Sequence, residues 1–217
     1  MYTLLIWMGE DVNGRDLRDH QWVPTLEGYR QANWNYAWYN NPWFGANHYQ
    51  KEFNSDLVNA QLQLSYALGD KFRLQLRGSG VLKKDFEDLE SPKSYFNYSA
   101  PREGSYQTWN RNRVNVDYDF LATYNNEFTD NFGLVAYAGA STFYRKYHEE
   151  FSATDGLTVP GVYNMGNSTG PVQAENYFQE KAINSVYGTL ELDFYDTYFL
   201  TASARNDWSS TLPEENR

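Results

Sequence analysis

A strict alternation of apolar and polar residues dominates the middle of the chain and starts at Leu57. From there to Leu68 the even-numbered positions are Val, Ala, Leu or Tyr, and the odd-numbered ones are mainly Asn, Gln and Ser. Because successive side chains of a strand point to opposite faces, this pattern predicts a strand with one apolar face. Gly69-Asp70 predicts a tight hairpin turn, since Gly accepts the positive φ that such turns require. The alternation resumes over 71–82, so the two segments are expected to pair antiparallel.

The same arrangement recurs twice farther along the chain. Residues 113–128 and 132–145 flank a turn at Asp130, and residues 184–194 and 197–208 flank a turn at Asp196. The segment 132–145 alternates least regularly. These strands run about 11 to 16 residues, whereas soluble strands cluster around five or six. A tilted strand needs about 9–11 residues to cross a bilayer, so the lengths favour membrane-spanning strands.

The connections alternate in length as well. Three are short turns, and the intervening ones are expected to be long loops over 83–112 and 146–182. Short turns on one side and long loops on the other are typical of outer-membrane barrels. The predicted fold is therefore all-β: an antiparallel transmembrane β-barrel segment, about six strands of a larger barrel, with short periplasmic turns and long extracellular loops. Residues 1–56 are expected to hold a strand end and an aromatic-rich extracellular loop, and residues 57–217 the hairpins, all within one partial barrel domain.

Charged and aromatic residues fit this arrangement. The face opposite the apolar one carries Arg73, Arg77, Asp117, Asp119, Glu191, Asp193, Arg205 and Asp207. In a large barrel that face lines a polar interior. Beside the short turns stand Tyr66, Phe72, Phe128, Phe132, Phe194 and Tyr198, as in an interfacial aromatic girdle. The alternative is a soluble antiparallel sheet whose polar face meets water.

Composition narrows the possible functions. The chain has 19 Tyr, 13 Phe and 7 Trp, which argues against disorder, and a net charge of −10, which argues against nucleic-acid binding. It has no cysteine, so disulfides and thiolate chemistry are excluded. The G-x-S-x-G match at 166–170 lies in a polar segment before Pro171 and is interpreted as a turn.

No cofactor or metal site is expected, and no enzymatic activity. The three histidines, His20, His48 and His148, are far apart in the sequence. The acidic runs 85–90 and 148–150 offer oxygen ligands for calcium but lack the spacing of a known calcium loop. They are interpreted as solvated acidic loops.

Aromatic residues crowd the segment 22–49 without regular alternation. Aromatic faces beside amide side chains suit sugars or peptides, because rings stack and amides form hydrogen bonds. The candidate substrate-binding residues are Trp34, Trp38, Trp43 and Trp109. The alternative is that these rings pack against their own neighbours.

Four stretches resemble the SusC/RagA family of TonB-dependent outer-membrane transporters. They are Ile6-Trp7-Met8-Gly9-Glu10-Asp11, Tyr39-Asn40-Asn41-Pro42-Trp43-Phe44, Val159-Pro160-Gly161-Val162-Tyr163-Asn164 and Arg205-Asn206-Asp207-Trp208-Ser209-Ser210-Thr211-Leu212-Pro213. The resemblance implies a middle section of the family's barrel, in a bacterial outer membrane, with lipid around it. It also implies TonB and a SusD-like lipoprotein as partners of the full-length protein, and a glycan or peptide nutrient as its substrate.

The family's plug domain and TonB-contacting segment are not recognisable in this chain, so it is expected to be a fragment of the transporter. The second hypothesis is a soluble or surface β-domain that binds carbohydrate through exposed aromatic residues. The two differ in the surroundings of Leu62, Leu64, Leu74, Leu76 and Val116, which face lipid in the first and are buried in the second.

Overall fold

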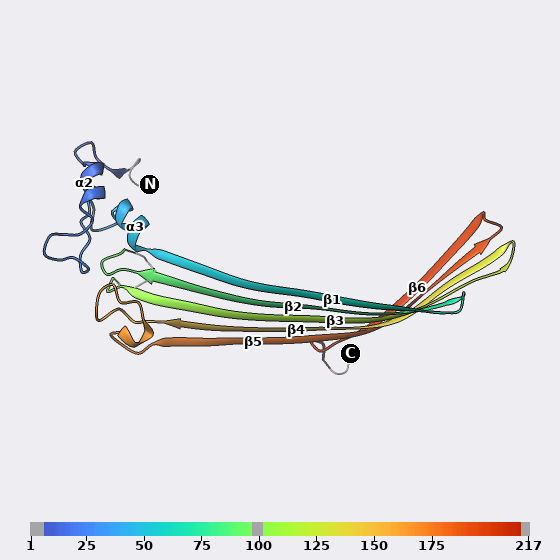
Figure 1. Cartoon of the computed structure of the whole chain (residues 1–217). Coiled ribbons are helices and arrows are strands. Elements are labelled where there is room, and N and C mark those ends of the chain that lie inside the picture. The colour runs from blue at the N-terminus through green and yellow to red at the C-terminus, as the bar shows by residue number, and fades with distance from the viewer. Residues whose placement is uncertain (1–6, 97–101, 214–217) are drawn as a thin grey trace. The chain divides into compact units, whose positions relative to one another are not determined.

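The computed structural model describes residues 7–96 and 102–213, and most of them form one antiparallel sheet of six strands. The strands pair in chain order, from β1 to β6, so each is a neighbour of the next along the chain (Figure 1). Strands account for 61% and helices for 8% of the structure. The all-β prediction and the three hairpins are confirmed. The strands are β1 Gln50–Leu68, β2 Phe72–Ser91, β3 Ser105–Thr129, β4 Phe132–Ala153, β5 Gln173–Phe194 and β6 Tyr198–Ser209.

A short turn joins the two strands of each hairpin where the sequence predicts it. Gly69 has a φ of 69°, the left-handed conformation that Gly adopts without strain. In the last turn Tyr195 and Asp196 also have positive φ values, of 59° and 51°. β5 and β6 pair in continuous register from Phe194 opposite Tyr198 to Ile183 opposite Ser209.

The strands extend farther from the turns than the sequence predicts, so both long loops are shorter than expected. The connection between β2 and β3 covers 92–104 and not 83–112, and that between β4 and β5 covers 154–172 and not 146–182. Likewise β1 begins at Gln50 and not at Leu57. The strands continue beyond the end of the apolar alternation, because polar contacts hold the outer parts of the strands together.

A ladder of ion pairs crosses these outer parts. Glu87 on β2 lies 2.7 Å from Lys51 Nζ on β1 and 3.0 Å from Arg111 Nη1 on β3. Arg111 Nε in turn lies 2.6 Å from Glu149 on β4. Glu87 is only 9% exposed. The interpretation of 85–90 and 148–150 as solvated acidic loops is therefore wrong: both runs are strand segments, and Glu87 and Glu149 are ion-paired.

The chain divides into two compact units. The loop unit comprises 1–55, 85–111 and 149–177, and the turn unit comprises 56–84, 112–148 and 178–217. The loop unit has a small core of Leu17, Phe44, Ala153 and Leu157, all less than 9% exposed. Its connection 154–172 contains the 3₁₀ turn η1, Met165–Asn167, and is closed by a bridge between Leu157 and Ser168.

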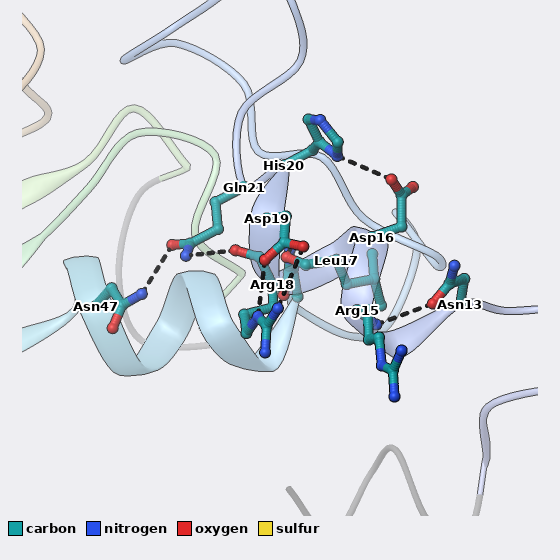
Figure 2. A network of polar contacts seen from close by, with 10 residues as sticks. Asn13, Arg15, Asp16, Leu17, Arg18, Asp19, His20, Gln21 and Asn47 are labelled. Atoms are coloured by element: carbon teal, nitrogen blue, oxygen red, sulfur yellow. Dashed lines mark hydrogen bonds and ion pairs between the residues drawn. The ribbon is translucent and has the colours of Figure 1, made fainter.

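The segment before β1 contains two short helices, α2 Gly14–Asp19 and α3 Pro42–His48. Asn13 caps α2 by accepting a hydrogen bond from the Arg15 backbone N–H, and Asp16 contacts His20 at the other end of the helix (Figure 2). Asn47 of α3 donates to the Gln21 side chain, which joins the two helical regions (Figure 2). In residues 7–49 the only strand-like pairing described is a bridge between Trp22 and Gln31. Residues 1–6 lie outside the described residues, and the strand end expected within 1–56 stays a prediction.

The apolar face of the turn unit is uncovered. Leu62, Leu64 and Leu76 are 65%, 57% and 50% exposed, and Leu74 and Val116 are half-buried. Three of the six aromatic residues predicted to cluster beside the turns are in contact: Phe132 stacks on both Phe128 and Phe194, with ring centroids 5.5 and 5.1 Å apart. Across the described ranges, none of the helices combines the length and apolar character needed to span a membrane.

Candidate functional site

The face of the turn unit opposite the apolar one carries a connected polar network. Its centre is Asp119 on β3. The Tyr187 hydroxyl on β5 donates a hydrogen bond of 2.6 Å to Asp119 Oδ2, and Arg77 Nη2 on β2 lies 3.3 Å from Asp119 Oδ1. Beside this pair, the Ser79 hydroxyl lies 3.5 Å from Asp117 Oδ2. Contacts thus run from β2 through β3 to β5.

Arg205 on β6 extends the network. Its Nη2 donates to the Ser185 hydroxyl at 2.8 Å, and its Nε contacts Asp207 Oδ1 at 2.8 Å. Its guanidinium carbon lies 5.5 Å from the centre of the Tyr187 ring, within range of a cation–π interaction. Arg205 and Asp207 begin the last of the four stretches that resemble the transporter family, and here they contact each other directly.

Gly139 on β4 makes the link between β3 and β5 possible. β4 lies between these strands, and the Tyr187 side chain passes over it to reach Asp119. A Cβ at position 139 would lie 2.4 Å from Cζ of the Tyr187 ring, too close for any side chain. Only Gly leaves room for the ring at this point of the sheet.

The network lines a hollow of about 430 Å³. Two guanidinium groups, of Arg77 and Arg205, and two carboxylates, of Asp117 and Asp119, line it, so the surface can bind water and polar solutes of either charge. The sequence places Arg77, Asp117, Asp119, Arg205 and Asp207 on this face. The structure brings Arg77, Asp119, Arg205 and Asp207 into the network and places Asp117 beside it, in contact with Ser79. The sequence does not predict the contact between Tyr187 and Gly139, because this contact depends on the register of β4 with β5, which alternation alone does not fix.

The four predicted Trp residues all lie in the loop unit, each in its own surroundings. Trp34 stacks on Tyr39, with centroids 5.2 Å apart, and Trp43 lies half-buried in the first turn of α3. Trp109 on β3 packs against Phe151 on β4 at 5.1 Å. Trp38 is 61% exposed. No ring contact joins any two of the four in the described parts of the chain. Their role in substrate binding remains a prediction.

The residues weighed for other chemistry have structural partners. His48 packs against Trp22 and Phe44, and its burial lowers the pKa of the imidazole. Ser168 of the G-x-S-x-G match accepts a hydrogen bond from the Asp155 backbone N–H at 3.0 Å and lies in the closed loop, as the turn interpretation predicts. Within 7–96 and 102–213 no three acidic or histidine side chains gather as a metal site would require.

Comparisons with known proteins place the fold among transporters. No protein-family model and no curated protein matches the sequence. A structure of the RagAB peptide transporter aligns with 81% of this chain, at 14% identity and a TM-score of 0.72. A structure of the RagAB peptide importer in the "closed-closed" state aligns with 82%, at 16% identity and a TM-score of 0.68.

The chain spans about one fifth of the length of these neighbours, because the alignments cover 20% of each of their chains. At this identity the likeness is one of fold. It supports the family resemblance at that level, and the sheet matches a fragment of a transporter β-barrel. Both neighbours are described as a peptide transporter or importer.

Proposed function

We propose that this chain is part of the barrel wall of a TonB-dependent transporter in a bacterial outer membrane. The full-length protein would import a peptide or glycan nutrient together with a SusD-like lipoprotein. The observation that carries the proposal is a single sheet with one uncovered apolar face and one charged face, in the fold of a peptide transporter. The Leu-rich face would meet lipid, and the network around Asp119 would line the interior.

The length of the apolar face supports a bilayer as its partner. On β4 the even-numbered residues from Phe132 to Ala140 are apolar, and farther along the Tyr144 hydroxyl donates to Glu180 of β5 at 3.1 Å. Lys146 lies 3.5 Å from the same carboxylate. An apolar stretch of about 9–11 residues that ends in a polar and aromatic zone matches the hydrocarbon thickness that a tilted strand crosses.

The loop unit would then lie outside the cell and meet the substrate, because recognition usually resides on loops held by a rigid scaffold. Trp34, Trp38, Trp43 and Trp109 remain our candidates there, since the Trp face offers the largest stacking area. The alternative, a surface domain that binds carbohydrate, requires Leu62, Leu64 and Leu76 to be buried. Their exposure in the described chain favours the transporter.

Import by cells that carry the intact gene tests the proposal. We expect a labelled oligopeptide or oligosaccharide to accumulate only when both the gene and TonB are present. Fractionation should place the protein in the outer membrane. Import at an unchanged rate after deletion of the gene, or a protein found in the soluble fraction, would contradict the proposal.

The Trp assignment has its own test. Each of the four Trp residues is replaced singly by Ala, and barrel assembly is checked by resistance to unfolding in detergent. Slower import by an assembled variant would support substrate contact. Normal assembly and import in all four variants would identify these rings as packing residues.

A further inference from the structure

We propose that the loop unit holds a binding site for the carboxylate groups of an acidic ligand. The site is a hollow of about 330 Å³ between the segment 29–39 and residues of the β2–β3 connection, where Lys93, Ser94, Phe96, Arg102 and Glu103 line it. The inference rests on the proposed function, because it names a ligand class for the face that would meet the substrate. None of the four predicted Trp residues lines this hollow.

Three cationic side chains converge on the hollow, and each lies over an aromatic ring. The guanidinium carbon of Arg30 is 4.9 Å from the centre of the Tyr36 ring, and that of Arg102 is 5.1 Å from the Phe96 ring. Lys93 Nζ is 5.4 Å from the Tyr29 ring. A cation–π contact attracts the cation to the face of the ring and does not pair the guanidinium N–H groups with an oxygen acceptor. The donors at the guanidinium edges therefore stay available to a ligand.

The charge around the hollow is unbalanced. Its one lining carboxylate is Glu103, 3.6 Å from Lys93 Nζ. The Lys93 side chain is 10% exposed and that of Glu103 is 72% exposed, so the cation lies deep and its partner lies in solvent. In the described part of the chain Arg30 and Arg102 have no ion-pair partner. This local excess of positive charge stands out in a protein with a net charge of −10.

A carboxylate is the ligand group that this arrangement fits best. The guanidinium fork pairs with a carboxylate through two parallel hydrogen bonds, and a poorly solvated ammonium adds a point charge beneath it. The exposed rings of Tyr29 and Tyr36 offer flat surfaces to the apolar parts of the same ligand. Among peptide and glycan nutrients, Asp- and Glu-containing oligopeptides and uronic-acid oligosaccharides carry this group.

Calorimetric titration of the purified full-length protein in detergent tests the site. The probes are a short Glu-rich peptide, its Gln counterpart and a galacturonic acid oligosaccharide. The variants are Arg30→Gln and Arg102→Gln, with Arg15→Gln as the matched control. Arg15 lies on α2 and does not line the hollow, so its replacement removes the same charge elsewhere. Circular dichroism confirms that each variant is folded.

We expect the Glu-rich peptide to bind at least about tenfold more tightly than the Gln peptide, as for a charge-assisted hydrogen bond gained. Arg30→Gln and Arg102→Gln should each remove most of that preference, and Arg15→Gln should leave it intact. Binding of only the oligosaccharide, with the same dependence on Arg30 and Arg102, would keep the carboxylate site and identify its source as a sugar.

Two results would overturn the site. One is equal affinity for the Glu and Gln peptides together with no binding of the oligosaccharide. The other is an equal loss of affinity in all three variants, which would indicate a diffuse charge effect. Neither affects the transporter proposal, which stands or falls on TonB-dependent import.

Discussion

The Asn41 side chain connects three parts of the segment before β1. It is fully buried, and its amide donates to the backbone oxygens of Leu17 and Ala32 at 2.7 and 2.9 Å. Its Oδ1 accepts from the backbone N–H groups of Trp43 and Phe44, which caps α3. One residue thereby joins α2, the strand-like bridge region and α3. This gives a physical reason for the Asn in the Tyr39–Phe44 stretch.

Replacing Asn41 by Ala should loosen this whole segment. The change removes a donor from the buried Leu17 carbonyl and from the partly buried Ala32 carbonyl, and it removes a helix cap. Together these losses cost about 2–4 kcal/mol in local stability. Hydrogen exchange of the full-length protein should show faster exchange across α2 and α3. Asn47→Ala, on the same helix but with one exposed bond to Gln21, is the control and should change little. Equal effects of the two changes would contradict the role of Asn41.

His48 should make the same segment sensitive to acid. Its burial against Trp22 and Phe44 lowers the pKa of the folded imidazole below the ordinary value of about 6.5. Between these two values the unfolded segment binds more protons than the folded one, so stability falls as the pH drops below about 6.5. Protease resistance of the segment should therefore decrease from pH 7 to pH 5.5. His48→Phe should abolish this decrease, whereas His20→Phe, at an exposed position, should retain it.

At the scale of strands, Gly139 tests whether the polar network is rigid. Gly139→Ala places a methyl group inside the Tyr187 ring position, so the ring must move and lose its bond to Asp119. We expect a loss of about 1–3 kcal/mol in unfolding free energy, typical of overpacking. Gly133→Ala on the same strand is the control, because its Cβ would lie 3.6 Å from Asp193, an ordinary contact. Thermal unfolding in detergent measures both variants, and equal midpoints would argue against a packed ring.

The two faces of β1 can be separated by neighbouring substitutions. Leu64→Arg should cost about 2–4 kcal/mol if Leu64 meets the bilayer midplane, while Gln63→Arg on the opposite face should cost little. Folding titrations of the full-length protein into lipid vesicles measure both. A similar cost at both positions would mean that the faces are not lipid and interior.

The strands also show which features of the fold the sequence pattern predicts and which it does not. Alternation with period two fixed all three hairpins, because lipid or a core must select one apolar side. It failed where the strands leave the apolar zone. There ion pairs hold the sheet together, among Lys51, Glu87, Arg111 and Glu149, and a run of charged residues has the same sequence pattern as a solvated loop. The hub at Asn41 and the contact of Tyr187 with Gly139 depend on tertiary register, which no local pattern encodes.

At the scale of the whole molecule, many large apolar side chains are exposed. β1 and β6 leave two sheet edges unpaired within the described chain, and the Leu-rich face lies open beside them. Unpaired edges and large apolar patches both promote association. A lipid or detergent layer would cover the apolar face, and further strands would pair with the two edges.

The 217-residue chain alone should therefore not persist as a soluble monomer. In detergent-free buffer we expect sedimentation velocity to show large, heterogeneous species, because apolar faces and strand edges join between molecules. Addition of detergent should reduce their size by covering the apolar face, while the open edges still permit some pairing. Leu62→Ser and Leu64→Ser together should shift the buffer sample toward smaller species, and Gln61→Ser with Gln63→Ser, on the other face, should not. A sharp, cooperative melt with a monomeric profile in plain buffer would mean that this face is covered by the chain itself, and would favour the surface β-domain over the transporter.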